Sequence, residues 1–247
     1  MPSGAQIVDG PDEARKAVRE QIKYGADLIK IYGTHRYRFE GGNLISIATF
    51  TPEEIHAIVD EAHNEGVKVA CHAYGGAGLH RCIDGGVDSI EHGLDLDDAS
   101  VREMAARGTW LVPTLTVYEG DTRKEDEARS GSKLSRASLH EASFKKATAA
   151  GLKIAFGTDV GPFPHGTQAV EFEYMTRLGM SPMAAIQCAT LRAAELMSWD
   201  SQLGSIEPGK FADIIAVAGN PLDDVTQLEH VRFVMKGGAV VRRDFAK

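Results

Sequence analysis

The alternation of short apolar segments with helix-like segments is the feature that most limits how this chain can fold. Strands alternating with helices form a parallel sheet with right-handed crossovers. Five segments have the composition of such strands and recur in a strand–helix rhythm: 27–32, 67–72, 87–91, 109–117 and 153–157. The sequence therefore predicts an α/β fold with about five strand–helix units.

The residues that follow the predicted strands indicate where a functional site lies. Segment 67–71 is short, apolar and rich in valine, which is typical of a strand buried on both faces, and His72 follows it directly. In α/β folds the carboxyl ends of the strands carry the chemistry. The residues at these ends are therefore the candidates for a functional site.

The rhythm changes after Gly204. Segments 212–217, 231–236 and 239–242 read as strands joined by glycine-containing turns, with no helix between them that would extend the repeat. The sequence thus predicts two parts, a strand–helix portion over 1–203 and a small β appendage over 204–247. A closed (β/α)8 barrel needs eight units, so five do not close one.

Bulk composition excludes several classes of protein. The net charge of −8 argues against a nucleic-acid partner, and no apolar run is long enough to span a membrane. The charged beginning is unlike a signal peptide, which leaves the compartment open: cytoplasmic, or exported within a longer parent. Three cysteines without a CxxC pair favour reduced or core residues over a disulfide framework.

Four strand ends carry side chains suited to metal chemistry: Lys30, His72, His92 and Asp159. Imidazoles and a carboxylate are good ligands for zinc or a similar divalent ion. A buried lysine with a lowered pKa can react with CO2 to give a carbamate, which also binds metal. Each residue alone also has a purely structural explanation. A histidine can be a hydrogen-bonded core residue, a lysine can extend to the end of its strand, and an aspartate can cap a helix. Their joint occurrence favours a metal site.

At these residues the chain resembles the metal-dependent amidohydrolase superfamily, in particular its imidazolonepropionase-like and Xaa-Pro dipeptidase (prolidase)-like branch. The resemblance covers about residues 20 to 240. It rests on Gly25-Ala-Asp-Leu-Ile-Lys-Ile31, Cys71-His-Ala-Tyr-Gly75, Ile90-Glu-His-Gly93, Gly157-Thr-Asp159, Gly179-Met-Ser-Pro182 with Ala189-Thr190, and Gly204-Ser-Ile-Glu-Pro-Gly-Lys-Phe-Ala-Asp213.

The resemblance implies a fold and a set of roles. The fold would be a partial TIM-like (β/α) barrel, its strands 4–8, with a C-terminal fragment of a β-sandwich domain. Lys30 would carry a carbamate that bridges two metals, zinc in the first instance, and His72 and His92 would hold the second metal. Asp159 would contact the first metal and shuttle protons during hydrolysis of a peptide or amide bond.

The chain departs from the family pattern at its beginning. The family opens its barrel with a His-x-His pair that holds the first metal, and this chain contains no His-x-His. Barrel strands one to three have no counterpart either. The number of metal ions, one or two, and the activity of the chain therefore stay open, and its exposed sheet edges predict a homo-oligomer or a complementing N-terminal portion.

Substrate recognition is predicted for four side chains. A dipeptidase must bind a free carboxylate, and Arg36, Arg38 and Tyr74 offer donors for one, while His165 would shape the pocket. The alternative for both arginines is a position on a solvated loop surface, without contact to a substrate. Two alternatives to an Xaa-Pro-type dipeptidase remain: an inactive remnant with a partial metal site, and a one-metal deaminase, against which Lys30 argues.

Overall fold

A computed structural model describes residues 5–244, and contacts between residues group the chain into two units. Unit 1 comprises the residues up to Val112 together with Gly120–Lys153. Unit 2 comprises Pro113–Glu119 together with the residues from Ile154 onward. The boundary expected from the sequence, between residues 203 and 204, lies inside unit 2 and stays a prediction.

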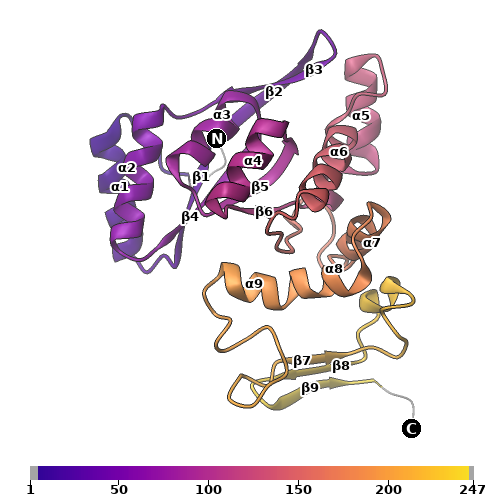
Figure 1. Ribbon diagram of the computed structural model, residues 1–247. Helices are drawn as coiled ribbons and strands as arrows, with labels where there is room; N and C mark the ends of the chain where they lie inside the picture. The colour runs from indigo at the N-terminus through magenta and orange to yellow at the C-terminus, as the bar shows by residue number, and fades with distance from the viewer. Residues whose placement is uncertain (1–4, 245–247) are drawn as a thin grey trace. The chain divides into compact units, whose positions relative to one another are not determined.

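A four-stranded parallel sheet with the order β1-β4-β5-β6 forms the centre of unit 1 (Figure 1). Its register places Tyr32 beside His72 and Ala73 beside His92, so the predicted site residues lie on adjacent strands. The α/β class with a parallel sheet is thus confirmed. The strands are β1 (Leu28–Tyr32), β4 (Lys68–Gly75), β5 (Ser89–Asp95) and β6 (Trp110–Val112).

The helices of unit 1 begin at strong sequence signals. At the start of α2, the Thr51 hydroxyl accepts a hydrogen bond from the Glu54 backbone, and the Glu54 carboxylate accepts one from the Thr51 backbone at 2.8 Å. Figure 1 shows α1 and α2 side by side against the sheet. The helices are α1 (Pro11–Lys23), α2 (Pro52–Asn64), α3 (Gly76–Gly85), α4 (Asp98–Arg107), α5 (Asp121–Ser130) and α6 (Arg136–Ala149).

An antiparallel hairpin occupies the segment between β1 and α2. It consists of β2 (Thr34–Glu40) and β3 (Asn43–Ala48). Gly41 and Gly42 form its turn with φ of 57° and 78°, a conformation that glycine adopts at little cost. A two-glycine turn between alternating segments was the sequence signal for this hairpin.

The strand predicted over 153–157 is not regular. Ile154 forms a single bridge, and the Phe156 N–H donates to the carbonyl of Cys188 at 3.0 Å instead of to a strand. The strand predicted over 109–117 is also shorter, because Pro113 lacks an N–H and Thr114 has φ of 55°. A 3-10 helix, η1 (Leu115–Tyr118), follows it.

The charged segment 118–135 contains α5. A buried ion pair fixes this helix: Asp126 has no exposed surface, and its Oδ2 accepts from the backbone N–H and Nε of Arg136 at 3.0 and 2.8 Å. The pairing joins α5 to the first residue of α6. The prediction missed α5 because a surface of charged residues gave no apolar periodicity to read.

A disulfide joins Cys71 on β4 to Cys82 on α3, so the expectation of unpaired cysteines was wrong for this pair. Both sulfurs lie against Gly33, where a side chain would collide with them. Cys188 is buried and free. The sequence contains no CxxC spacing, and the packing of β4 on α3 brings the two cysteines together.

Unit 2 combines three helices with a three-stranded antiparallel sheet in the order β7-β8-β9, which confirms the predicted β strands. Residues 182–196 form two short helices that meet at Thr190. The elements are α7 (Val170–Arg177), α8 (Pro182–Ala189), α9 (Leu191–Leu196), β7 (Ile214–Ala216), η2 (Val225–Glu229), β8 (Phe233–Lys236) and β9 (Ala239–Arg243).

A buried carboxylate organises η1 within unit 2. Glu171 of α7 has no exposed surface and accepts hydrogen bonds from the Leu115 N–H, the Thr116 N–H and the Thr116 hydroxyl at 2.7, 2.8 and 2.6 Å. Burial raises the pKa of Glu171 to about 7, against the opposing effect of these three donors. Glu171 therefore ties the segment after β6 to α7.

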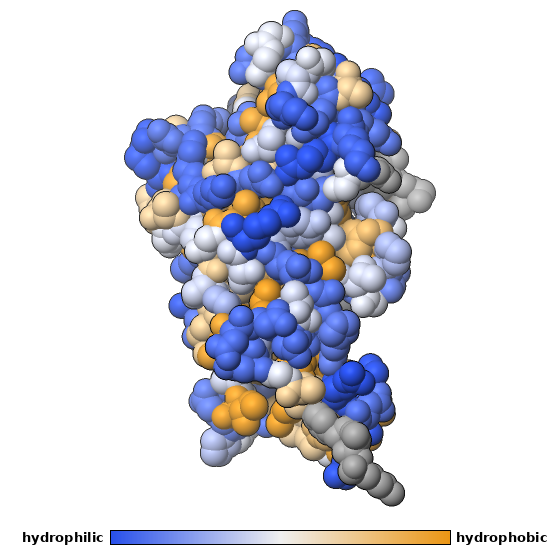
Figure 2. Space-filling view, turned by 90° about the vertical axis from the view of Figure 1, so that its right-hand side faces the viewer, coloured by the Kyte–Doolittle hydropathy of each residue, from blue (hydrophilic) through white to orange (hydrophobic). Residues whose placement is uncertain are grey.

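Polar and apolar side chains are mixed over the surface shown in Figure 2. Within residues 5–244, no helix has both the length and the apolar character needed to cross a membrane.

Candidate functional site

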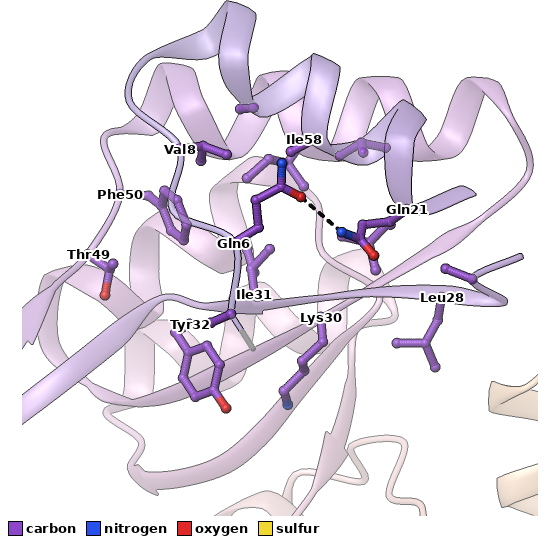
Figure 3. A pocket seen from close by; sticks show the side chains of 16 residues that line it. Gln6, Val8, Gln21, Leu28, Lys30, Ile31, Tyr32, Thr49, Phe50 and Ile58 are labelled. Carbon is purple, nitrogen blue, oxygen red and sulfur yellow. Dashed lines mark hydrogen bonds between the residues drawn. The ribbon is translucent and has the colours of Figure 1, made fainter. Parts of the chain in front are cut away.

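The two faces of β1 serve different purposes. Ile29 and Ile31 are buried, while Lys30 and Tyr32 alternate with them and point to the opposite face. Figure 3 shows this division: the side chains of Lys30 and Tyr32 extend away from the helices that cover the other side of the strand. Lys30 therefore belongs to the face of the sheet that carries His72, since Tyr32 is the neighbour of His72 in the register.

A cavity of about 430 Å³ lies between β1 and the helices of unit 1, and it is mainly apolar. Its one hydrogen bond drawn in Figure 3 runs from the Gln21 amide to the Gln6 side-chain oxygen at 2.9 Å. Lys30 borders the cavity, but its side chain points away from it. The candidate chemistry therefore lies on the other face of the sheet. The apolar side chains that line the cavity include those of Val8, Val18, Ile29, Ile31, Phe50 and Ile58.

The two predicted histidine ligands lie on the neighbouring strands β4 and β5, where their rings meet. The ring centroids of His72 and His92 are 4.6 Å apart, and the ring of Tyr32 lies 5.1 Å from that of His72. His92 is 4% exposed and has φ of 74°, in the left-handed region that non-glycine residues rarely adopt. Backbone strain of this kind concentrates at functional sites, where the surrounding structure holds it in place.

The electrostatics keep both imidazoles neutral. Burial, and to a lesser extent the nearby charge of Lys30, together lower the pKa of His72 to about 4. Burial, then His72, Lys30 and His140, lower the pKa of His92 well below its ordinary value. Neutral imidazole is the form that binds metal, so at neutral pH this pair is ready to coordinate a cation.

The donor set of unit 1 fits a divalent metal in part. His72 and His92 supply two nitrogen donors, and Lys30 is close enough to both to shift their pKa values. Within residues 5–244, no group of three or more His, Cys, Asp or Glu side chains gathers as a ready metal site. Completing the coordination within unit 1 would therefore require a modified Lys30.

Asp159 and His165, the two other predicted site residues beyond β5, belong to unit 2. Both are exposed there, and Asp159 has φ of 50° in the loop after Ile154. The structure thus brings Lys30, His72 and His92 together in one unit. The participation of Asp159 and His165 stays a prediction.

The predicted substrate-binding residues occupy two different places. Tyr74 lies against the histidine pair, with its ring centroid 4.8 Å from that of His72 and 5.8 Å from that of His92. Arg36 and Arg38 are exposed on β2, where Arg38 donates to the Glu40 carboxylate at 2.8 Å. Contact of these arginines with a substrate stays a prediction.

Sequence reasoning missed several residues around the site. Glu91 lies beside His72 in the register and accepts a hydrogen bond from the Ser89 hydroxyl at 2.6 Å. His140 is buried in α6 and interacts with the backbone of His92, although no role was predicted for it. A signal for His140 was present: it lies on the same face of α6 as the buried Phe144.

Comparisons with known proteins identify relatives of this chain over nearly its whole length. The model of the Amidohydrolase family matches residues 1–241. The curated ochratoxinase of Aspergillus niger is 34% identical over 245 residues, covering 96% of this chain and 50% of that protein. The chain therefore spans about half the length of this relative.

Two solved structures are similar in fold and sequence. A Xaa-Pro dipeptidase with methionine bound in its active site is 43% identical with a TM-score of 0.85, covering 95% of this chain and 59% of that one. A prolidase in complex with N-methylphosphonate-L-proline is 33% identical with a TM-score of 0.82, covering 97% of this chain and 60% of that one.

Proposed function

This chain belongs to the amidohydrolase family, and we propose that it carries part of the active site of a metal-dependent hydrolase that cleaves C–N bonds in dipeptides of the Xaa-Pro type. The observation that carries the proposal is the pair of neutral imidazoles, His72 and His92, with Lys30 beside them. Prolidase and Xaa-Pro dipeptidase structures among the similar proteins support the substrate class.

Four residues would hold the metal: His72, His92, Asp159 and Lys30. For Lys30 this requires that its neutral amine attacks CO2, forming an N–C bond and releasing a proton, to give a carbamate with two oxygen donors. Zinc suits imidazole and oxygen ligands, with one or two ions in the site. When bound, the metal supplies an activated water near neutral pH and polarises the scissile carbonyl.

The side chains of the chain itself would perform two further tasks. The Asp159 carboxylate takes a proton from the attacking water and returns it to the leaving nitrogen. The Tyr74 hydroxyl donates a hydrogen bond to the carboxylate of the substrate, with Arg36, Arg38 and His165 as further predicted contacts. The burial of His72 and His92 excludes water around the reacting bond and strengthens these polar interactions.

A complementing partner forms part of this proposal. Within the described sheet, β1 is an edge strand, so its outer side is open to a further strand. The similar proteins are longer than this chain, and the His-x-His pair expected in the family is absent from it. We favour an N-terminal portion of the family type as the partner, with a second copy of this chain as the alternative.

Metal content and turnover test the proposed function. The full chain, incubated with zinc and desalted, should retain zinc by mass spectrometry and hydrolyse Xaa-Pro dipeptides, alone or with an added N-terminal portion from a relative. Replacing His72 with alanine should remove most of the bound zinc. The matched control is His80→Ala, because His80 is exposed and pairs with Asp97 away from the site. Equal zinc retention by both variants would contradict the proposed site, and zinc binding without turnover in any combination would favour an inactive remnant.

A further inference from the structure

A line of aromatic rings leads outward from the histidine pair. Tyr74 contacts His72 and His92, and on its other side the ring of Tyr37 lies 6.0 Å away at an interplanar angle of 64°. Tyr37 comes from the β2–β3 hairpin, whereas Tyr74 comes from the end of β4. The orientation of Tyr74 beside the site therefore depends in part on what holds Tyr37.

Three polar groups hold Tyr37. The guanidinium carbon of Arg136 lies 4.4 Å from the centroid of its ring, in cation–π geometry. Its hydroxyl donates to Asp126 Oδ1 at 3.2 Å and accepts from Arg129 Nη1 at 3.1 Å. Asp126 in turn accepts from Arg136, so that Tyr37, Asp126 and Arg136 form one closed cluster between the hairpin and the helices α5 and α6.

Arg136 differs from an ordinary surface arginine. Its side chain is 15% exposed and its partner Asp126 is fully buried. Burial opposes its charge, yet the pKa of Arg136 is raised above its ordinary value by Asp126 and also by Tyr37 and Tyr74. The guanidinium thus keeps its charge within interaction range of the same tyrosine that touches both histidines.

A buried ion pair is a poor way to gain stability. Removing a charge from water costs roughly several kcal/mol per ion. Well-packed apolar residues of similar volume often stabilise a fold as much as a buried ion pair, or more. A charged pair in this place, between a hairpin and two helices, therefore has another effect. It defines a single orientation for the planar guanidinium, and through it for the two tyrosine rings.

We propose that Arg136 is a positioning residue that, anchored on Asp126 and stacked on Tyr37, fixes Tyr74 beside the His72–His92 pair. This inference rests on the proposed function, in which the Tyr74 hydroxyl donates a hydrogen bond to the carboxylate of the substrate. Arg136 acts through Tyr74 and not by direct contact with the substrate.

Ligand binding to the zinc-loaded full chain provides the first test. Arg136→Met should weaken binding of N-acetyl-L-proline at least tenfold in calorimetry, while binding of N-acetyl-L-prolinamide, which lacks the acid, changes less than twofold. Tyr74→Phe should cause the same loss, and the double variant should lose no more than Tyr74→Phe alone. Additive losses, or an equal loss for both ligands, would overturn the proposal.

Arg129→Met is the matched control. Arg129 contacts the same tyrosine hydroxyl, but its side chain is 60% exposed and, among the described residues, it pairs with Glu125 and not with Asp126. This variant should bind both ligands within twofold of the wild-type chain. A loss of acid binding as large as that of Arg136→Met would show that any cation near Tyr37 suffices, which contradicts a specific role for Arg136.

Nuclear magnetic resonance gives a readout that needs no ligand. With labelled tyrosines, ring protons of Tyr37 and Tyr74 should show a cross-relaxation peak in the wild-type chain and in Arg129→Met, and the peak should be lost in Arg136→Met. If that variant does not fold, Arg136→Lys replaces it, because lysine keeps the charge but cannot stack as a plane on Tyr37 or grip two oxygens. An intact peak refutes the positioning role. If the wild-type chain binds no N-acetyl-L-proline, the proposed substrate class fails, while the peak still decides the role of Arg136.

Discussion

Replacing Glu171 with glutamine should remove a pH dependence from the stability of unit 2. In the folded chain burial raises the pKa of Glu171 to about 7, whereas the ordinary value is 4.5. Between these two values the folded state holds a proton that the unfolded state has released, so stability falls as the pH rises through this window. At about 1.4 kcal/mol per pKa unit, the wild-type chain should lose about 2–3 kcal/mol between pH 5 and pH 8 from this group. Glutamine keeps an acceptor for the η1 donors but does not titrate.

The assay is urea unfolding followed by tryptophan fluorescence. The sequence contains two tryptophans, and a Trp110→Phe background leaves Trp199, in unit 2, as the reporter. Other titrating groups cancel when the stability of Glu171→Gln is subtracted from that of its parent at each pH. Glu207→Gln, an exposed carboxylate of unit 2, is the control and should show no pH-dependent difference. A difference for Glu171→Gln that stays constant, or that grows in favour of the parent at high pH, would show that the three donors keep the carboxylate ionised and would refute the reasoning.

Three further predictions concern unit 1. Thr51→Ala removes the capping box of α2 and should destabilise the chain by about 1 kcal/mol in urea unfolding, and an unchanged midpoint would contradict the capping role. Cys71 and Cys82 should resist alkylation in denaturant until a reductant is added, and mass spectrometry that finds three modified thiols without reductant would show that the pair is open. Gly33→Ala should cost about 1–3 kcal/mol because its new methyl group meets both sulfurs, and relief of this cost in a Cys82→Ala background would identify the sulfur contact as the cause.

Local patterns in the sequence were enough to predict the parts of the site that follow strand ends. Lys30, His72 and His92 each come at or near the end of an apolar segment, and parallel strands bring such ends to one edge of a sheet. Membership of the amidohydrolase family, predicted from the motifs around these residues, is confirmed. The helices with clear caps, such as α2, were also predictable because their signals lie within a few residues of one another.

The contacts that sequence reasoning missed are those between distant segments. Arg136 reaches Tyr37 across nearly a hundred residues, and no periodicity links a helix start to a hairpin of that separation. The disulfide of Cys71 likewise depends on the packing of α3 on β4. The segment 153–157 has the composition of a strand, but its backbone donors find partners elsewhere, which composition cannot reveal.

The edge position of β1 has a consequence for how metal and partner affect each other. Lys30 lies in this strand, so a chain that pairs with the outer side of β1 would lie next to a predicted metal-binding group. Association and metal uptake would then be thermodynamically linked, and each would strengthen the other by the same factor. Zinc titrations at several partner concentrations should show that the binding curves of zinc and of the partner shift by the same factor.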